Sequence, residues 1–332
     1  MGKYLKKFDT HAEYNTYING QDKILPNVSY CVDNNDVHYN PWIGLIIKFN
    51  VTSTSEVTKL TFNATTAAQF SEMWIDDVKQ NNVVVSYTFA TTGEHVVKYK
   101  LVDPTTIDVN SFNQCSNITS VILPNTLTTI GDAAFYYCIN LASIRIPNSV
   151  TTIGDYAFTE CSSLVNITIP KNITEIGEGV FKTCTNLTSV TIPNGVTSIG
   201  DQAFYECTSL TSLIIPNNVT EIGEFCFISC TSLTNVIIGN NVTYIGSSAF
   251  AGSSITSITI PSSVTNISQY AFRACSNLAS VTVEATTPPI LESNVFDNNA
   301  SSRKIYVPSE SVAAYKAASG WSTYASDIEA IQ

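Results

Sequence analysis

Cysteine is the residue type in this sequence whose number and spacing most directly raise the question of chemistry. The chain has 332 residues and nine cysteines, and none of them forms the C-x-x-C spacing of a zinc site. Neighbouring copies of a stacked repeat would place equivalent Cα atoms about 5 Å apart, within disulfide range, but parallel side chains suit the disulfide torsion poorly. We interpret these residues as buried, inert thiols. Cys226 stands at an alanine position of other copies, and Cys31 lies outside the repeat. Seven cysteines recur at one repeat position: Cys115, Cys138, Cys161, Cys184, Cys207, Cys230 and Cys275.

Histidine, the usual general base of enzymes, occurs only at His11, His38 and His95. A Ser-His-Asp or Cys-His arrangement would therefore have to be built from the N-terminal part of the chain. No G-x-S-x-G, P-loop or H-E-x-x-H motif is present. Asp33, Asp36 and His38 match no recognised metal-site spacing, and we interpret them as a solvated turn. The sequence predicts no catalytic residue, no cofactor and no metal site, and hence a non-enzymatic protein.

Acidic residues also recur at a fixed position, three residues before a repeated phenylalanine. Paired carboxylates can perform acid–base catalysis. One carboxylate per copy, placed at the start of a turn, instead predicts capping of a short helical turn. The residues of this column are Asp132, Asp155, Glu178, Asp201 and Glu224.

The elements that must position these side chains repeat every 23 residues, with one step of 22. In one copy, Leu187, Val190 and Ile192 alternate with polar residues as in a strand, Pro193 ends it, and Phe204 points inward. A single copy cannot bury such an apolar face alone, whereas stacked copies can. We predict a β-rich solenoid of about eight coils over residues 105–285, with parallel strands and short turns of helix. The phenylalanine column is Phe112, Phe135, Phe158, Phe181, Phe204, Phe227, Phe250 and Phe272.

The pattern AFxxCxxLTSVTIPxxVTxIGxxAF, over about residues 106–285, resembles the BspA-like leucine-rich repeat. This resemblance implies a right-handed, curved solenoid that binds proteins and mediates adhesion at microbial surfaces. It also implies a cell-surface or extracellular location. Residues 286–332 are similar to the C-terminal end of that family, and we expect a capping unit there. Its predicted parts are a strand over 305–307, a helix capped by Ser309, and a plug made of Trp321 and Tyr324.

The first third of the chain lacks the repeat. Residues 44–104 alternate as strands, for example LIIKFNV and EHVVKYKLV, and predict a small antiparallel β-domain or sandwich with a hairpin turn at Thr92-Gly93. This domain looks like the one that often precedes such repeats. Residues 1–43 resemble leader segments of structural proteins from gut-bacterial phages, which implies an attachment segment. No apolar stretch follows the basic start, so we expect no secretory signal peptide.

Composition limits the classes of partner. The formal net charge is −11, charged residues make up only 13%, and no basic cluster is present, which argues against nucleic-acid binding. No apolar run reaches the roughly 18 residues of a membrane span. The predicted surface is therefore neutral, hydroxylated and amide-rich, and the expected partner is a protein or a cell-surface ligand.

We number the positions of each repeat strand from its first leucine, so that in the copy starting at Leu187 the third position is Ser189 and the fifth is Thr191. The fifth position should face outward between two core residues. Isoleucines at this position in adjacent copies predict an apolar contact patch, although strand propensity alone could also place them there. The candidate partner-binding residues are Ile122, Arg145, Ile214, Ile237 and Tyr306. Two functions remain open: a surface-presented binding or adhesion module, and a virion or mobile-element structural protein that binds a host and is attached through residues 1–43.

Overall fold

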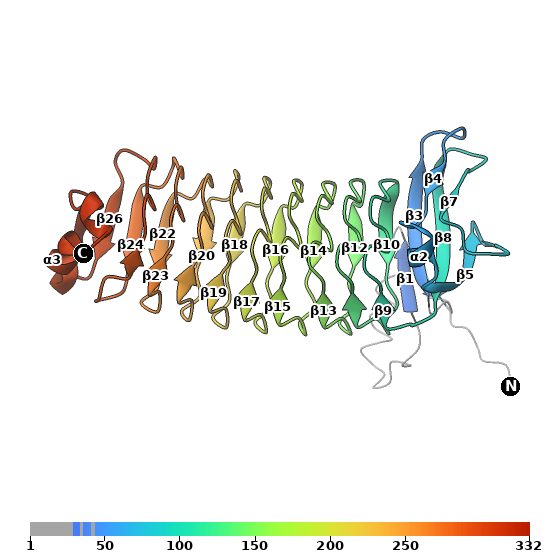
Figure 1. Cartoon of the computed structure of the whole chain (residues 1–332), viewed down its shortest axis with the longest axis horizontal. Coiled ribbons are helices and arrows are strands. Elements are labelled where there is room, and N and C mark those ends of the chain that lie inside the picture. Colours follow the sequence, from blue (N-terminus) through green and yellow to red (C-terminus); the bar gives the residue numbers. More distant parts are fainter. Residues whose placement is uncertain (1–28, 34–35, 41–43) are drawn as a thin grey trace.

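The computed structural model describes residues 29–33, 36–40 and 44–332, with side chains described from residue 44 onward. The chain forms an elongated stack of coils between an antiparallel sheet at one end and a small helical unit at the other (Figure 1). Strands β1 (Ser29–Asp33) and β2 (Asp36–Asn40) pair antiparallel. Most of the predicted attachment segment, and the side chains of Cys31 and His38, lie outside the described part, so its role stays a prediction.

Two sets of short strands run along the stack, and within each set the strands pair in parallel. The predicted solenoid is therefore confirmed, and its ladders continue beyond residue 285 through β25 and β26. The first set comprises β10 (Ile118–Ile122), β12 (Ser143–Arg145), β14 (Asn166–Thr168), β16 (Ser189–Thr191), β18 (Ser212–Ile214), β20 (Asn235–Ile237), β22 (Ser257–Ile260), β24 (Ser280–Val283) and β26 (Lys304–Val307). The second set comprises β9 (Thr106–Ile107), β11 (Thr129–Ile130), β13 (Thr152–Ile153), β15 (Glu175–Ile176), β17 (Ser198–Ile199), β19 (Glu221–Ile222), β21 (Tyr244–Ile245), β23 (Asn266–Ile267) and β25 (Ile290–Leu291).

The core is a column of phenylalanine rings, one per coil. Consecutive ring centroids lie 5.2–5.8 Å apart from Phe112 to Phe296, and the rings are close to parallel. Phe296 extends the column that was predicted to end at Phe272. The cysteines of the repeat position lie beside these rings, and six of their thiols donate to a phenylalanine carbonyl of the preceding coil, as Cys161 Sγ does to Phe135 O at 3.3 Å. Cys115 in the first coil donates to Asn113 O instead. The repeat thus stacks identical contacts along the whole rod.

Each coil has a third side, which joins its second-set strand to the next first-set strand. This side consists of non-helical turns, and the predicted short turn of helix is wrong, since residues 68–308 contain no helix. Two residues per coil adopt left-handed backbone conformations, such as Ala133 (φ 50°) and Tyr137 (φ 59°). The phenylalanine N–H between them donates to the next coil, from Phe135 to Ala157 O at 2.8 Å. Three N–H groups per coil donate to the next coil in this way, so they are not available for the hydrogen bonds within a helix.

The acidic column accordingly does not cap helices, and this prediction is wrong. Asp155 Oδ1 accepts the backbone N–H of Glu178 in the next coil at 2.9 Å, and Asp201 Oδ1 accepts that of Glu224 at 2.7 Å. The carboxylates therefore join one coil to the next. The glycine immediately before each acidic residue is likewise required by contact between coils, because a Cβ on Gly223 would lie 2.5 Å from the carbonyl carbon of Gly200.

The N-terminal sheet is continuous with the solenoid. Its strand order is β12-β10-β3-β8-β5-β6, and β3 (Leu45–Val51) pairs antiparallel with β10. The other strands are β8 (Gly93–Leu101), β5 (Phe70–Ile75) and β6 (Val78–Lys79), together with a separate pair of β4 (Thr58–Lys59) and β7 (Ser86–Tyr87). The predicted hairpin at Thr92-Gly93 is wrong, because β8 pairs with β3 and β5 while β7 pairs with β4.

This N-terminal unit also supplies hydrogen-bond donors to the first coil. A short helix, α2 (Ala64–Ala67), begins with a capping box made by Asn63 at its N-cap and Thr66 in its first turn. Just before it, Phe62 N donates to Ser111 O at 3.1 Å, and Lys59 Nζ donates to Asn113 O at 2.9 Å. The equivalent carbonyls of later coils accept from the coil before them. The unit therefore replaces a missing preceding coil.

The C-terminal unit closes the opposite end. It comprises η1 (Ser309–Ser311), α3 (Val312–Ala317), η2 (Trp321–Tyr324) and β27 (Ile328–Ala330). Trp321 and Tyr324 are buried as predicted, and Trp321 Nε1 donates to Pro289 O at 2.8 Å. The expected Ser309 cap is wrong, since no side-chain cap bond is made and Ser309 Oγ contacts Glu310 instead.

Candidate binding surface

The described cysteines and His95, the side chains most able to perform chemistry, are buried in the fold. All eight described cysteines are buried and unpaired by disulfides, and burial raises the pKa of Cys115 and of Cys230 to about 12. His95 is buried, with Nδ1 2.6 Å from Asp76 Oδ2 and Nε2 2.9 Å from Thr91 O. Within residues 44–332, no group of three or more histidine, cysteine or acidic side chains gathers as a metal site would require.

The first strand set presents one face of the solenoid to solvent. We call its fifth strand positions the outward lane: Ile122, Arg145, Thr168, Thr191, Ile214, Ile237, Thr259, Thr282 and Tyr306. In the short central strands β18 and β20, the first and last residues are exposed and the residue between them is buried. The alternation follows from the two-residue period of a strand. The predicted outward orientation of these positions is thus present in the structure.

The predicted binding residues differ in exposure along the lane. Ile214 is 64% exposed, Ile237 is 53% exposed, and the two are paired in register on adjacent strands. Arg145 is also exposed and lies beside Ile122, which is half-buried. Tyr306 is half-buried next to Thr282 at the C-terminal end. The structure therefore joins the two isoleucines into one patch and separates Arg145 and Tyr306 from it.

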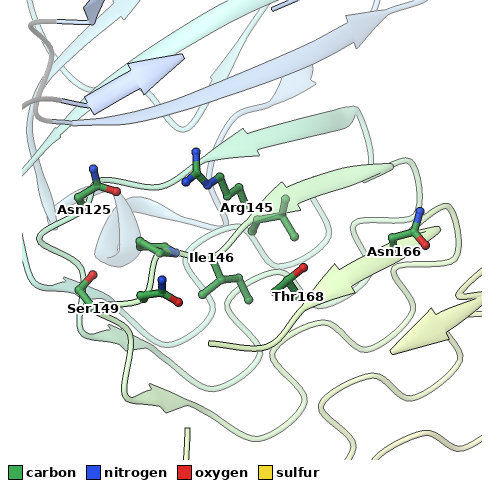
Figure 2. Close-up of a pocket in the computed structure, with 9 residues that line it drawn as sticks. Asn125, Arg145, Ile146, Ser149, Asn166 and Thr168 are labelled. Carbon is green, nitrogen blue, oxygen red and sulfur yellow. The ribbon is translucent and has the colours of Figure 1, made fainter. Parts of the chain in front are cut away.

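A shallow hollow of about 630 Å³ surrounds Arg145 (Figure 2). Its lining comes from three neighbouring coils and includes Asn125, Asn148, Ser149 and Thr168. Within the part of the chain that the structure describes, the Arg145 guanidinium has no hydrogen-bond or ion-pair partner. The hydroxyl oxygen of Ser149 is buried without a partner among the same residues. The hollow thus combines one unpaired cation with several neutral hydrogen-bonding groups.

A second hollow of about 310 Å³ occupies the equivalent place about four coils further along. Ile237 lines it together with Asn235, Asn240, Thr259 and Glu284. Sequence reasoning did not find either hollow. The available signal was an asparagine that follows the proline position in most copies, because Asn125 and Asn148 line the first hollow and Asn240 lines the second. These asparagines are Asn125, Asn148, Asn194, Asn217 and Asn240.

Negative charge lies on other sides of the coil. The acidic column lies on the turn side, and Glu175 and Glu221 are exposed on the second strand set. From β10 to β24 the third and fifth strand positions hold no carboxylate. The third positions carry only serine or asparagine, and some bond to each other, as Ser189 Oγ does to Asn166 Oδ1 at 3.2 Å. The third and fifth positions are thus free of carboxylates from β10 to β24, while Glu284, which lines the hollow at Ile237, lies outside these positions.

Parallel coils, one stacked phenylalanine ring per turn with a buried thiol beside most of them, and an exposed strand face define a leucine-rich repeat solenoid. A model of the BspA type leucine-rich repeat region (6 copies) matches residues 105–216 and 197–318. The chain therefore belongs to the BspA-type leucine-rich repeat family. No curated protein matches it. Among the residues that the structure describes, no helix is both long and apolar enough to cross a membrane.

The chain is also similar to solved structures of bacterial proteins. A leucine-rich repeat protein from Bacteroides ovatus is 23% identical, with a TM-score of 0.53, covering 86% of this chain and 71% of that one. The leucine-rich repeat protein of T. pallidum is 27% identical over 54% of this chain and 76% of that one, with a TM-score of 0.38. The pneumococcal vaccine antigen PcpA is 19% identical over 68% and 69%, with a TM-score of 0.42. The first of these similarities supports the fold.

Proposed function

We propose that this protein is a non-enzymatic binding module that presents the outward lane to a protein at or outside a cell surface. The observation that carries the proposal is the exposed pair Ile214 and Ile237 on adjacent strands. Other copies place threonine at the same position, as at Thr191 and Thr259, so the core does not require isoleucine there. Membership of a leucine-rich repeat family supports protein binding as the use of this face.

The lane has the physical composition of an interface. Burying one exposed isoleucine against a partner contributes about 1.5–3 kcal/mol. Arginine is among the residues that most often dominate binding energy, and Arg145 is available for such a contact. Serine and asparagine at the third positions offer hydrogen bonds without bulk. A virion-attached host-binding protein would use the same lane, and it differs only in the role assigned to residues 1–43.

Photo-crosslinking tests this function directly. A benzophenone amino acid is placed at Ile214 in one variant and at Glu221, on the second strand set of the same coil, in a matched control. Both are exposed to cells and to extracellular proteins. We expect a discrete crosslinked protein from position 214 and none from position 221. Equal crosslinking from both positions, or crosslinking from position 221 alone, contradicts the proposal.

A further inference from the structure

We propose that the segment bound by the outward lane is an extended acidic peptide. It places a carboxylate at Arg145 and an apolar side chain, roughly four to six residues away, over Ile214 and Ile237. This inference rests on the proposed function and adds to it the chemistry and spacing of the partner.

The first element is the cation. The Arg145 side chain is exposed, lines the larger hollow, and has no partner among the described residues. A guanidinium binds a carboxylate through two parallel hydrogen bonds, which a lone hydroxyl or amide cannot match. Asn125 and Thr168 line the same hollow (Figure 2), and Asn148 also lines it. They can donate to a carboxylate or to the peptide amide oxygens beside it.

Other arginines of the chain are already engaged. Arg303 Nη2 lies 2.6 Å from Asp327 Oδ2, and the Arg273 guanidinium lies 5.1 Å from the ring centroid of Tyr270. Arg145 therefore differs from them in lacking a partner. It is also the one charged residue of the outward lane as defined above.

The second element is the surrounding charge. Carboxylates recur on the turn side at Asp132 and Asp155 and on the second strand set at Glu175 and Glu221. An acidic peptide is repelled from both of these sides and meets no carboxylate at the third or fifth positions between β10 and β24. The rod therefore directs a negative segment to the lane that contains Arg145. Selection against other docking sites arises from the same repulsion.

The third element is distance. Arg145 and Ile214 are three coils apart, and Arg145 and Ile237 are four coils apart. With neighbouring strands about 4.8 Å apart, these separations are roughly 14 and 19 Å, which an extended chain spans in about four to six residues. Between them lie Thr168 and Thr191, which are exposed and small. No large side chain of the lane obstructs an extended backbone laid across the strands.

The isoleucine pair favours a peptide over an acidic saccharide. A uronic acid polymer carries carboxylates but no aliphatic side chain that could cover Ile214 and Ile237. These two side chains have the largest exposed fractions among the apolar residues of the lane. An apolar residue of a peptide removes this area from water, and the gain scales with the area buried.

Fluorescence anisotropy with the full chain and labelled decapeptides tests the inference. The peptides have a serine, threonine and glycine background with one glutamate and one leucine, two, five or eight residues apart, and each has a twin with lysine in place of glutamate. We expect the glutamate peptide with spacing five to bind tightest. Arg145→Ala should weaken it about tenfold, about 1.4 kcal/mol, while Arg273→Ala should not. The double variant Ile214→Thr/Ile237→Thr should weaken binding of leucine peptides relative to alanine versions.

Several outcomes overturn the inference. They are equal affinity for glutamate and lysine peptides, no effect of Arg145→Ala, no preference for spacing, and no binding by any peptide at about 1 mM. Polygalacturonate that binds through Arg145 but independently of both isoleucines would replace the peptide with a saccharide. If the crosslink from position 214 appears while glutamate gives no advantage, the proposed function stands and only the acidic peptide fails.

Discussion

The backbone N–H of Phe296 donates to the phenolic oxygen of Tyr324 at 3.2 Å. In earlier coils the same N–H donates to a carbonyl of the next coil, as Phe204 N does to Cys226 O at 2.9 Å. Tyr324 therefore supplies the acceptor that the next coil would have provided. Burial raises the pKa of Tyr324 to about 12, so its hydroxyl stays protonated and donates in turn to Asp297 Oδ1 at 2.9 Å.

Replacing Tyr324 by phenylalanine should lower the free energy of unfolding by about 1–3 kcal/mol. The reason is that a buried N–H is left without an acceptor while the ring is retained. Tyr306→Phe is the control, because its hydroxyl makes no such bond, and its change should stay within about 0.5 kcal/mol. Urea denaturation measures both. Equal effects of the two substitutions would show that Tyr324 does not close the ladder.

The ring column predicts a position-dependent cost of removing phenylalanine. Phe204→Ala deletes a fully buried ring that stacks 5.3 Å from each neighbour, and it should cost about 3–5 kcal/mol. Phe225 is half-buried on the turn side, and Phe225→Ala should cost far less. Thermal and urea unfolding compare the two variants. Similar losses would contradict the assignment of the core to the stacked column.

Stability should fall as the pH rises through the range in which thiols ionise. Burial raises the pKa of Cys115 and of Cys230 from 9.0 to about 12, and it also raises that of Cys161 and Cys207. Above pH 9 the unfolded chain loses these protons first, so the free energy of unfolding decreases between about pH 9 and pH 12. Below pH 9 this contribution is fully present.

Urea denaturation under reducing conditions at a series of pH values measures this dependence. Cys161→Ala removes one titrating thiol and should reduce the slope by up to about 1.4 kcal/mol per pH unit. A slope that is the same in Cys161→Ala and in the wild type would mean that the buried thiols do not govern this range.

The left-handed turn residues predict opposite effects for two neighbouring alanines. Ala133 has φ 50°, where glycine fits without the penalty of about 1 kcal/mol that a Cβ carries, so Ala133→Gly should be neutral or stabilising. Ala134 is fully buried and absent from the left-handed set, so Ala134→Gly should destabilise by about 1 kcal/mol or more. Calorimetry distinguishes them. Equal destabilisation by both would contradict the turn geometry.

The core was predictable because its period is almost invariant. Phe204 and Cys207 were placed inside from spacing alone, and both are fully buried. Phe296 was missed because a spacing of 24 breaks the column. Ala133 and Tyr137 gave no warning of left-handed backbone, since their positions carry many residue types. That conformation is set by hydrogen bonds between coils rather than by local sequence.

The ends and the surface depended on contacts between distant segments. Strand β5 was missed, and β8 was given the wrong partner, because pairing within an antiparallel sheet is not encoded in alternation alone. The outward orientation of Ile214 followed from the strand period. The hollow at Arg145 did not, because its lining also includes Asn125, Asn166 and Thr168 from the two neighbouring coils.

The outward lane is tested most directly by a binding comparison at unchanged stability. The wild type, Arg145→Ala and Ile214→Thr/Ile237→Thr are measured for binding to a cell or extracellular protein captured by the wild type, and each is also unfolded thermally. We predict that both variants keep the wild-type melting temperature and lose binding. Full binding by both variants at the wild-type melting temperature would contradict the assignment of the lane as the binding surface.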